Sequence, residues 1–346
     1  MKNKYRNIFL FFGIAAIVVM LFTFDMEPGE LWTSLQKAGG WLPAIMALWI
    51  VIYLINALSW YIIIRDGEGA RVPFWKIYKL TVSGFALNYA TPVGLMGGEP
   101  YRIMELTPYV GGSKATSSVI LYVMMHILSH ICFWLFAVIL YVVFFEVNMF
   151  MAILLSIIGT ASLLAIYFFM KGYKNGMVVK ALRIAQKIPF LKKWAIGFSE
   201  RKKETLEKID SQIAQLHKQR KRTFYASLFL EFFARILGCL EIYFILYILT
   251  DHVSFLSCIL IMAFSSLFAN LFFFSPMQLG AREGGLALAV GKLAIPGAFG
   301  VYTGLITRVR ELLWIAIGVL LMKVGNDVNI ATKKPVLKKS KYEKAC

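Results

Sequence analysis

Two nine-residue stretches in distant parts of the chain share one pattern: residues 91–99 read TPVGLMGGE, and residues 275–283 read SPMQLGARE. Both fit Ser/Thr-Pro-x-x-Leu-x-x-x-Glu, and an asparagine precedes each, at Asn88 and Asn270. A Ser or Thr directly before Pro is a helix-start signal, because the hydroxyl can cap the first turn and proline has no N–H that needs a partner. Pro100 could start a further short helix in the same way. The pattern therefore predicts two half-helix starts, at Thr91-Pro92 and at Ser275-Pro276.

These stretches interrupt two long apolar regions, 76–111 and 255–297, in a chain that is apolar throughout. Of its 346 residues, 59% are hydrophobic and 16% are charged, whereas a soluble domain is nearer half apolar and a quarter charged. A membrane-spanning helix needs about 20 apolar residues. The sequence therefore predicts an all-α polytopic membrane protein in which the two broken regions accompany about six full spans, at residues 7–24, 41–64, 115–145, 149–170, 223–249 and 301–323.

The net charge of +18 is concentrated at the N-terminus, in residues 171–222 and in the tail, 324–346. Because basic residues favour the cytoplasmic side, we expect a protein of the cytoplasmic membrane with both chain ends in the cytoplasm. Under this topology each broken region enters and leaves on one face, and the two come from opposite faces. We therefore expect two re-entrant hairpins in inverted-topology repeats, one in a first membrane half (1–170) and one in a second (223–323). The alternative is two kinked spanning helices without pseudo-symmetry.

The basic segment 171–222 is too polar to span a membrane. Some of its apolar residues recur at helical spacing, which is typical of an amphipathic helix on a membrane surface, with a charged linker between the halves as the alternative. Together with the tail, 324–346, it predicts contact with anionic lipid. Nucleic acid is another partner that so basic a chain could bind, but the basic segments flank apolar spans, so we expect no nucleic-acid partner.

Many charged residues fall inside the apolar regions, where each costs roughly 2.5–3.5 kcal/mol and by default marks function. Arginine holds phosphate in a planar fork and stays protonated when it is desolvated. A half-helix that starts inside the membrane also directs free N–H groups towards an anion. We therefore expect arginines from both halves to line one phosphate site, with glutamates setting its charge and asparagines beside them: Arg102, Arg235, Arg282, Arg308, Glu99, Glu283, Asn88 and Asn270.

Structural ion pairing is the alternative for these charges. Arg235 lies four residues from Glu231, and Arg308 lies three residues from Glu311. Each pair could bridge neighbouring turns of one helix. Arg310 is predicted to lie near a membrane interface.

The remaining reactive residues give no sign of catalysis. His126 and His130 lie four apart on one helix face, a spacing that could hold a metal, but no third ligand is evident, so we expect packed histidines. The four cysteines lack paired spacing, and no hydrolase, nucleotide-binding or metalloprotease motif occurs. The sequence therefore predicts no catalytic residue, no metal and no cofactor.

Two segments resemble the signatures of a known family. Residues 97–102 read GGEPYR, with Ser113-Lys114-Ala115 shortly after, and residues 276–285 read PMQLGAREGG. These resemble the lysylphosphatidylglycerol synthase transmembrane region, also called flippase-like membrane proteins, over most of the chain. Arg308 fits this resemblance too. The second segment departs from the family's Pro-Gly-Gly-Leu-Gly-x-x-Glu pattern at Met277-Gln278, which implies a stiffer backbone there.

The resemblance implies a helical bundle with re-entrant elements that translocates a lipid. In two-domain members, a separate cytoplasmic domain attaches an amino acid to phosphatidylglycerol. This chain ends at Cys346 without such a domain, so we expect no aminoacyl transfer. The leading hypothesis is a translocator for a phospholipid or a polyprenyl-phosphate carrier, and the alternative is a non-catalytic membrane subunit that recruits a separate transferase.

Overall fold

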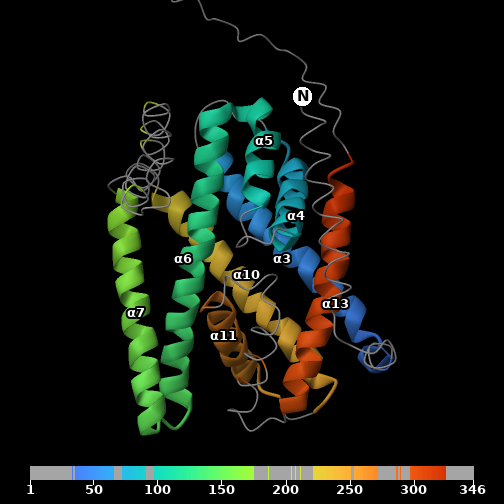
Figure 1. The fold of residues 1–346 in the computed structure, drawn as a ribbon, viewed down its shortest axis with the longest axis vertical. Coiled ribbons are helices and arrows are strands. Elements are labelled where there is room, and N and C mark those ends of the chain that lie inside the picture. The colour runs from blue at the N-terminus through green and yellow to red at the C-terminus, as the bar shows by residue number, and fades with distance from the viewer. Residues whose placement is uncertain are drawn as a thin grey trace, which may run out of the picture.

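The computed structural model describes residues 36–65, 72–90, 97–174, 221–250, 253–271 and 297–324, with a few isolated residues between them. Every element in these ranges is an α-helix, as the sequence predicts (Figure 1). The first expected span, 7–24, most of segment 171–222 and the tail from residue 325 lie outside the described residues. The helices are α3 (Trp41–Arg65), α4 (Phe74–Ala90), α5 (Gly98–Val110), α6 (Gly112–Phe144), α7 (Met149–Lys174), α10 (Lys221–Tyr247), α11 (Phe255–Leu271) and α13 (Gly297–Leu321).

Three of the described helices are long and apolar enough to cross a membrane: α3, α6, and α7 over Met149–Lys171. They coincide with the spans expected at 41–64, 115–145 and 149–170. Helices α10 and α13 have similar lengths, 27 and 25 residues, but carry several charged residues. On α6 and α7 large apolar side chains such as Val143, Phe150 and Phe168 are exposed, which suits a surface in contact with lipid.

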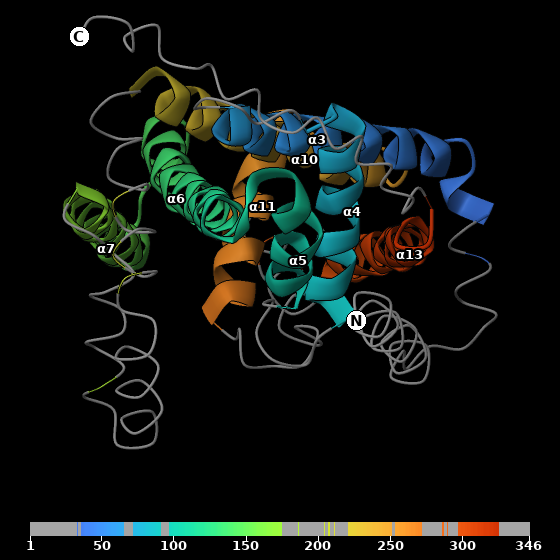
Figure 2. The same cartoon turned by 90° about the horizontal axis from the view of Figure 1, so that it is seen from above.

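Helices α3 and α10 form an antiparallel pair that crosses the molecule diagonally (Figure 1). Ser59 near the end of α3 meets Ser227 near the start of α10, with 2.8 Å between their hydroxyl oxygens. At the other end of the pair, Trp41 packs edge-on against Tyr247 at 5.6 Å. Seen from above, this pair forms one side of the bundle (Figure 2). Helices α6, α4, α11 and α13 pack against it, and α5 packs on α4 and α6.

Helices α4 and α5 form a short antiparallel hairpin. Lys76 near the start of α4 pairs with Glu105 near the end of α5 at 2.8 Å, while Asn88 contacts the start of α5 at the other end. At 1.5 Å per residue the two helices span only about 25 Å and about 20 Å, less than the roughly 30 Å of a bilayer core. Gly111, at φ 80°, then turns the chain into α6, which is 33 residues long.

The two halves of the bundle pack in a related way. In the first half α3 contacts α4, and in the second half α10 contacts α11 in the same way. Helix α4 then packs on α13 of the other half, just as α11 packs on α6. The contact of α4 with α13 is close: the Ser83 hydroxyl donates to the Gly318 carbonyl at 2.9 Å. A Cβ on Gly318 would collide with Ala86, so only glycine allows this approach.

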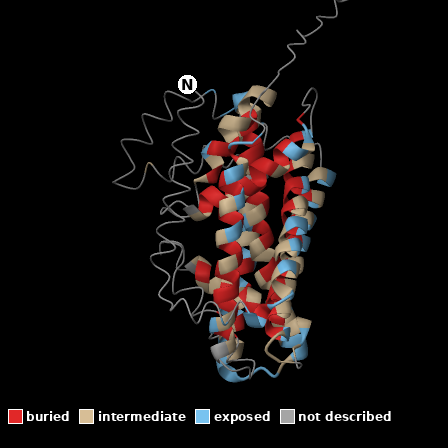
Figure 3. Cartoon of the chain, turned by 90° about the vertical axis from the view of Figure 1, so that its right-hand side faces the viewer, coloured by how far each residue is buried: buried red, intermediate tan, exposed pale blue. Residues whose placement is uncertain are grey.

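Buried residues run through the bundle along its whole length (Figure 3). Most are apolar, but Arg102 and Arg310 are among the largest fully buried side chains, and Glu231, Glu241 and Glu311 are buried as well. Charged groups in an apolar interior need partners. The arrangement of those partners defines the candidate site.

Candidate functional site

Arg102 on α5 lies at the centre of the first polar cluster, with 1% of its surface exposed. Its guanidinium donates to two backbone carbonyls of α4, those of Leu80 at 3.3 Å and Thr81 at 3.2 Å. Its one carboxylate contact within the described residues, with Glu99, is long at 3.5 Å. The guanidinium carbon also lies within 4.9–5.7 Å of three aromatic ring centres, those of Phe85, Tyr122 and Trp60, where cation–π attraction stabilises the charge. Among the described residues, most of the groups that contact the Arg102 guanidinium are thus neutral.

Two glycines allow Arg102 to lie between the hairpin helices. A Cβ on Gly84 would collide with Nε of Arg102, and a Cβ on Gly98 would collide with the Gly84 carbonyl. Gly84 was not among the residues predicted for the site. The sequence feature that could have identified Gly84 is its position four residues before Asn88, because residues at that spacing share one helix face.

Asn88 joins the two helices at the tip of the hairpin. Its Oδ1 accepts a hydrogen bond from the Gly98 backbone N–H at 2.6 Å, and its Nδ2 donates to Oε1 of Glu99 at 3.0 Å. Helix α5 therefore begins at Gly98, next to the Pro100 start signal, with Glu99 in the first turn where a negative charge is favourable. The predicted start at Thr91-Pro92 lies outside the described residues.

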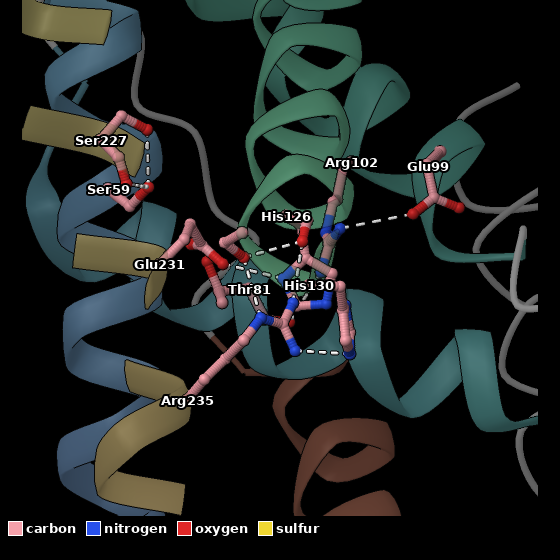
Figure 4. A network of polar contacts seen from close by, with 10 residues as sticks. Ser59, Thr81, Glu99, Arg102, His126, His130, Ser227, Glu231 and Arg235 are labelled. Atoms are coloured by element: carbon pink, nitrogen blue, oxygen red, sulfur yellow. Dashed lines mark hydrogen bonds and ion pairs between the residues drawn. The ribbon is translucent and has the colours of Figure 1, made fainter. Parts of the chain in front are cut away.

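Arg235 on α10 reaches across to α6. Its Nε donates to the Ser129 hydroxyl at 2.8 Å, one Nη contacts Nε2 of His130 at 2.5 Å, and the other Nη donates to the His126 carbonyl at 2.8 Å. A guanidinium can only donate, so Nε2 of His130 must accept. His130 is therefore a neutral imidazole with its proton on Nδ1. Figure 4 shows Arg235 and Arg102 converging on the two histidines from different helices.

Glu231, one turn before Arg235, pairs with α6 instead of with its own helix neighbour. Its Oε2 lies 2.8 Å from Nδ1 of His126. The local Arg235–Glu231 pair that the sequence offered as an alternative is thus replaced by two separate links from α10 to α6. With 1% exposure, Glu231 is as deeply buried as Arg102.

Unpartnered polar atoms gather around this cluster. The Trp60 ring stacks on the Tyr122 ring with 5.5 Å between ring centres, and the centres of the Tyr122 and His126 rings are 6.4 Å apart. Within the described part of the chain, several buried atoms here have no hydrogen-bond partner: Trp60 Nε1, Glu99 Oε2, Tyr122 Oη and Glu231 Oε1. Buried polar groups are normally bonded, so a concentration of exceptions points to a polar ligand or to water. We call the following residues the open network: Asn88, Glu99, Arg102, His126, His130, Glu231 and Arg235.

A second cluster ties α13 to α10 and α3. Arg310 binds both carboxylate oxygens of Glu241, at 2.8 and 3.1 Å, and lies 3.9 Å from the Trp49 ring centre. Arg308 pairs with Glu311 at 3.1 Å, and Arg310 also contacts Glu311 at 3.8 Å. Arg308, predicted for the phosphate site, therefore forms the local helix pair that was its alternative. We call Glu241, Arg308, Arg310 and Glu311 the closed network.

The predicted residues of the second hairpin are only partly described. Asn270 donates to the Ser266 carbonyl of its own helix at 2.7 Å. Ser275, Pro276, Arg282 and Glu283 lie outside the described residues. Among the residues that are described, no three His, Cys, Asp or Glu side chains gather as a metal-ligand set.

Comparison with known proteins gives one match. Residues 8–318 match the family described as the lysylphosphatidylglycerol synthase TM region. No curated protein and no solved structure matches the chain. The match covers both networks and both hairpin regions, and it confirms the resemblance inferred from residues 97–102 and 276–285.

Proposed function

The chain belongs to the lysylphosphatidylglycerol synthase TM region family, and from this premise we propose that it translocates a lipid with a phosphate-bearing headgroup across the cytoplasmic membrane. The family is a membrane domain associated with lipid modification and translocation. The observation that carries the proposal is Arg102: a fully buried arginine, held mainly by neutral acceptors, among unpartnered polar atoms.

Phosphate suits this arrangement better than the present contacts do. An arginine fork makes two parallel hydrogen bonds to a phosphate, each stronger than a bond to a neutral carbonyl. Among the described residues, Arg102 has one carboxylate contact, at 3.5 Å, to give up, and Arg235 contacts a hydroxyl, an imidazole and a carbonyl. A headgroup between α5, α6 and α10 would gain both guanidinium groups, while its acyl chains stay in lipid.

The topology that we propose places this site near the middle of the bilayer. The α4–α5 hairpin is shorter than a bilayer core, which supports a re-entrant element, and the related packing of the two halves supports inverted repeats. Helices α10 and α13 would be full spans with their charges turned inward. Both termini would be cytoplasmic, with residues 171–222 and 324–346 on the anionic lipid surface.

Transport is proposed here in place of catalysis. The rival function is a membrane subunit that recruits a separate lipid-modifying transferase. The two differ in one observable, which is whether the purified protein moves lipid without a partner.

The test is leaflet exchange in proteoliposomes. Fluorescent phosphatidylglycerol would be reconstituted with the purified protein, and dithionite would quench the outer leaflet. We expect faster exchange with the wild type, loss of the acceleration with Arg102→Gln, and a normal rate with Arg222→Gln, which removes an exposed arginine at the start of α10.

The outcomes separate the hypotheses. A normal rate with Arg102→Gln would remove Arg102 from the site. If the wild type moves neither phosphatidylglycerol nor a polyprenyl phosphate, the recruiting function becomes the better account. Circular dichroism of each variant controls for folding.

A further inference from the structure

The two histidines of the open network lie one helical turn apart on α6 but differ in chemistry. His130 accepts a hydrogen bond at Nε2 from Arg235. A proton on that nitrogen would place an imidazolium N–H against a guanidinium, so both the hydrogen bond and the charge balance oppose it. His130 is therefore fixed as the neutral form.

His126 has the opposite environment. Its Nδ1 lies 2.8 Å from the Glu231 carboxylate and donates to it, which leaves Nε2 to take a second proton. The carboxylate then stabilises the imidazolium as an ion pair. The His126 side chain is 31% exposed whereas Glu231 is 1% exposed, so a proton can reach the imidazole while its counter-charge stays buried.

Among the described residues, the charged groups around His126 come from α5 and α10, and further titratable groups come from α6. Arg102 and Glu99 belong to α5, Arg235 and Glu231 to α10, and His130 and Tyr122 to α6 itself. Helices α4 and α3 contribute the Phe85 and Trp60 rings to the same cluster. Among the described residues the two arginines and two glutamates cancel, so one proton on His126 adds a net charge of about +1 to this part of the cluster.

Glu231 has a second available partner. It lies four residues before Arg235 on α10, the spacing at which a glutamate and a cationic side chain meet on one helix face. While His126 is charged, the Glu231 carboxylate is held on α6. When His126 is neutral, that attraction weakens and the nearby Arg235 guanidinium becomes the stronger electrostatic partner for the carboxylate.

We propose that the His126–Glu231 pair is a proton-binding site that controls whether Arg235 is free to hold phosphate. With a proton bound, Glu231 stays on His126 and Arg235 can receive the anion. Without it, Glu231 moves to Arg235 and competes with the anion. Binding of a proton would thus favour binding of the lipid phosphate. This coupling of proton binding to lipid transport rests on the proposed translocation.

Proton binding can be measured without lipid movement. In full-length protein labelled with 15N-histidine in lipid nanodiscs, we expect the His126 signal to change from neutral to imidazolium in a titration from about pH 8 down to about pH 4. His126→Gln assigns that signal by removing it. The His130 signal should stay neutral over the same range. A neutral His126 throughout, or a titrating His130 in its place, would overturn the proposal.

Coupling is measured by leaflet exchange at equal pH on both sides. Because protonation frees Arg235, the wild-type rate should rise about tenfold from pH 8 to pH 5, and the rate of His126→Gln should change less than about twofold. Glu231→Gln cannot bind Arg235 as an anion, so its rate should also be independent of pH. His130→Gln should be slower but keep the pH dependence.

The two proposals fail in different ways. A titrating His126 in a protein that moves no lipid leaves the proton site standing and removes the translocation function. Lipid movement that is independent of pH in the wild type leaves translocation standing and overturns the coupling.

Discussion

The open and closed networks contain the same charges in different arrangements. Each has two arginines and two glutamates at buried or partly buried positions. In the closed network Arg310 meets both oxygens of Glu241, and Arg308 meets Glu311. In the open network Arg235 contacts neutral groups, Arg102 has one long carboxylate contact, and Glu99 and Glu231 each keep one oxygen without a partner among the described residues.

Pairing geometry, and not composition, therefore separates the two roles. In a cluster whose charges are all paired, no charged group is left to bind a ligand, and the ion pairs stabilise the contact between the helices. A cluster whose cations rest on neutral acceptors retains the ability to bind an anion. Substitutions in the two networks should accordingly act on different properties, stability in one and transport in the other.

The largest effect is expected from Glu241→Leu. This change leaves the Arg310 guanidinium buried without its principal carboxylate, which typically costs about 3–5 kcal/mol. The measurement is thermal unfolding of the purified protein, followed by intrinsic tryptophan fluorescence. The double variant Glu241→Leu/Arg310→Met should recover much of the loss, because it removes both charges. An unfolding midpoint equal to the wild type for Glu241→Leu alone would show that the closed network does not stabilise the fold.

Gly84→Ala should come next, at about 1–3 kcal/mol, because the added methyl group overpacks the contact with Arg102. The matched control is Gly238→Ala in α10, where an added Cβ meets nothing within 4 Å. There alanine should stabilise the helix by about 0.5–1 kcal/mol. Opposite shifts in the unfolding midpoint are expected. Equal shifts would mean that the α4–α5 approach is not set by Gly84.

Arg235→Gln should cost less stability, about 1–2 kcal/mol, because it removes hydrogen bonds to neutral groups and Glu231 keeps its bond to His126. Leaflet exchange should nevertheless fall at least about tenfold, as one good ionic hydrogen bond to phosphate is lost. Measuring unfolding and exchange on the same preparation sharpens the comparison. A loss of stability as large as that of Glu241→Leu would place Arg235 in a structural role.

The positions of the membrane helices could be predicted from the sequence, but the partners of the buried charged residues could not. The apolar spans at 41–64 and 115–145 coincide with α3 and α6, because length and hydropathy alone define a membrane helix. The pairing of Glu241 with Arg310, 69 residues apart, depends on how α10 and α13 cross, which no local pattern encodes. Arg310 was predicted only to lie near a membrane interface, and its burial against Glu241 was not foreseen. Gly84 was missed because its role appears only when Arg102 lies against it.

The two asparagines of the repeated pattern give the smallest and most specific comparison. Asn88 bonds the Gly98 N–H and Glu99 on the next helix, whereas Asn270 donates to Ser266 within its own helix. Asn88→Ala removes the hydrogen bond to the first N–H of α5 and a link across the hairpin tip, so it should cost about 1 kcal/mol. Asn270→Ala removes a bond inside a helix and should cost about half as much or less. Hydrogen exchange of the α5 amides, read by mass spectrometry, should increase only in Asn88→Ala. If Asn270→Ala loosens α5 equally, the two hairpins are mechanically linked, and the hairpin tip is not held by Asn88 alone.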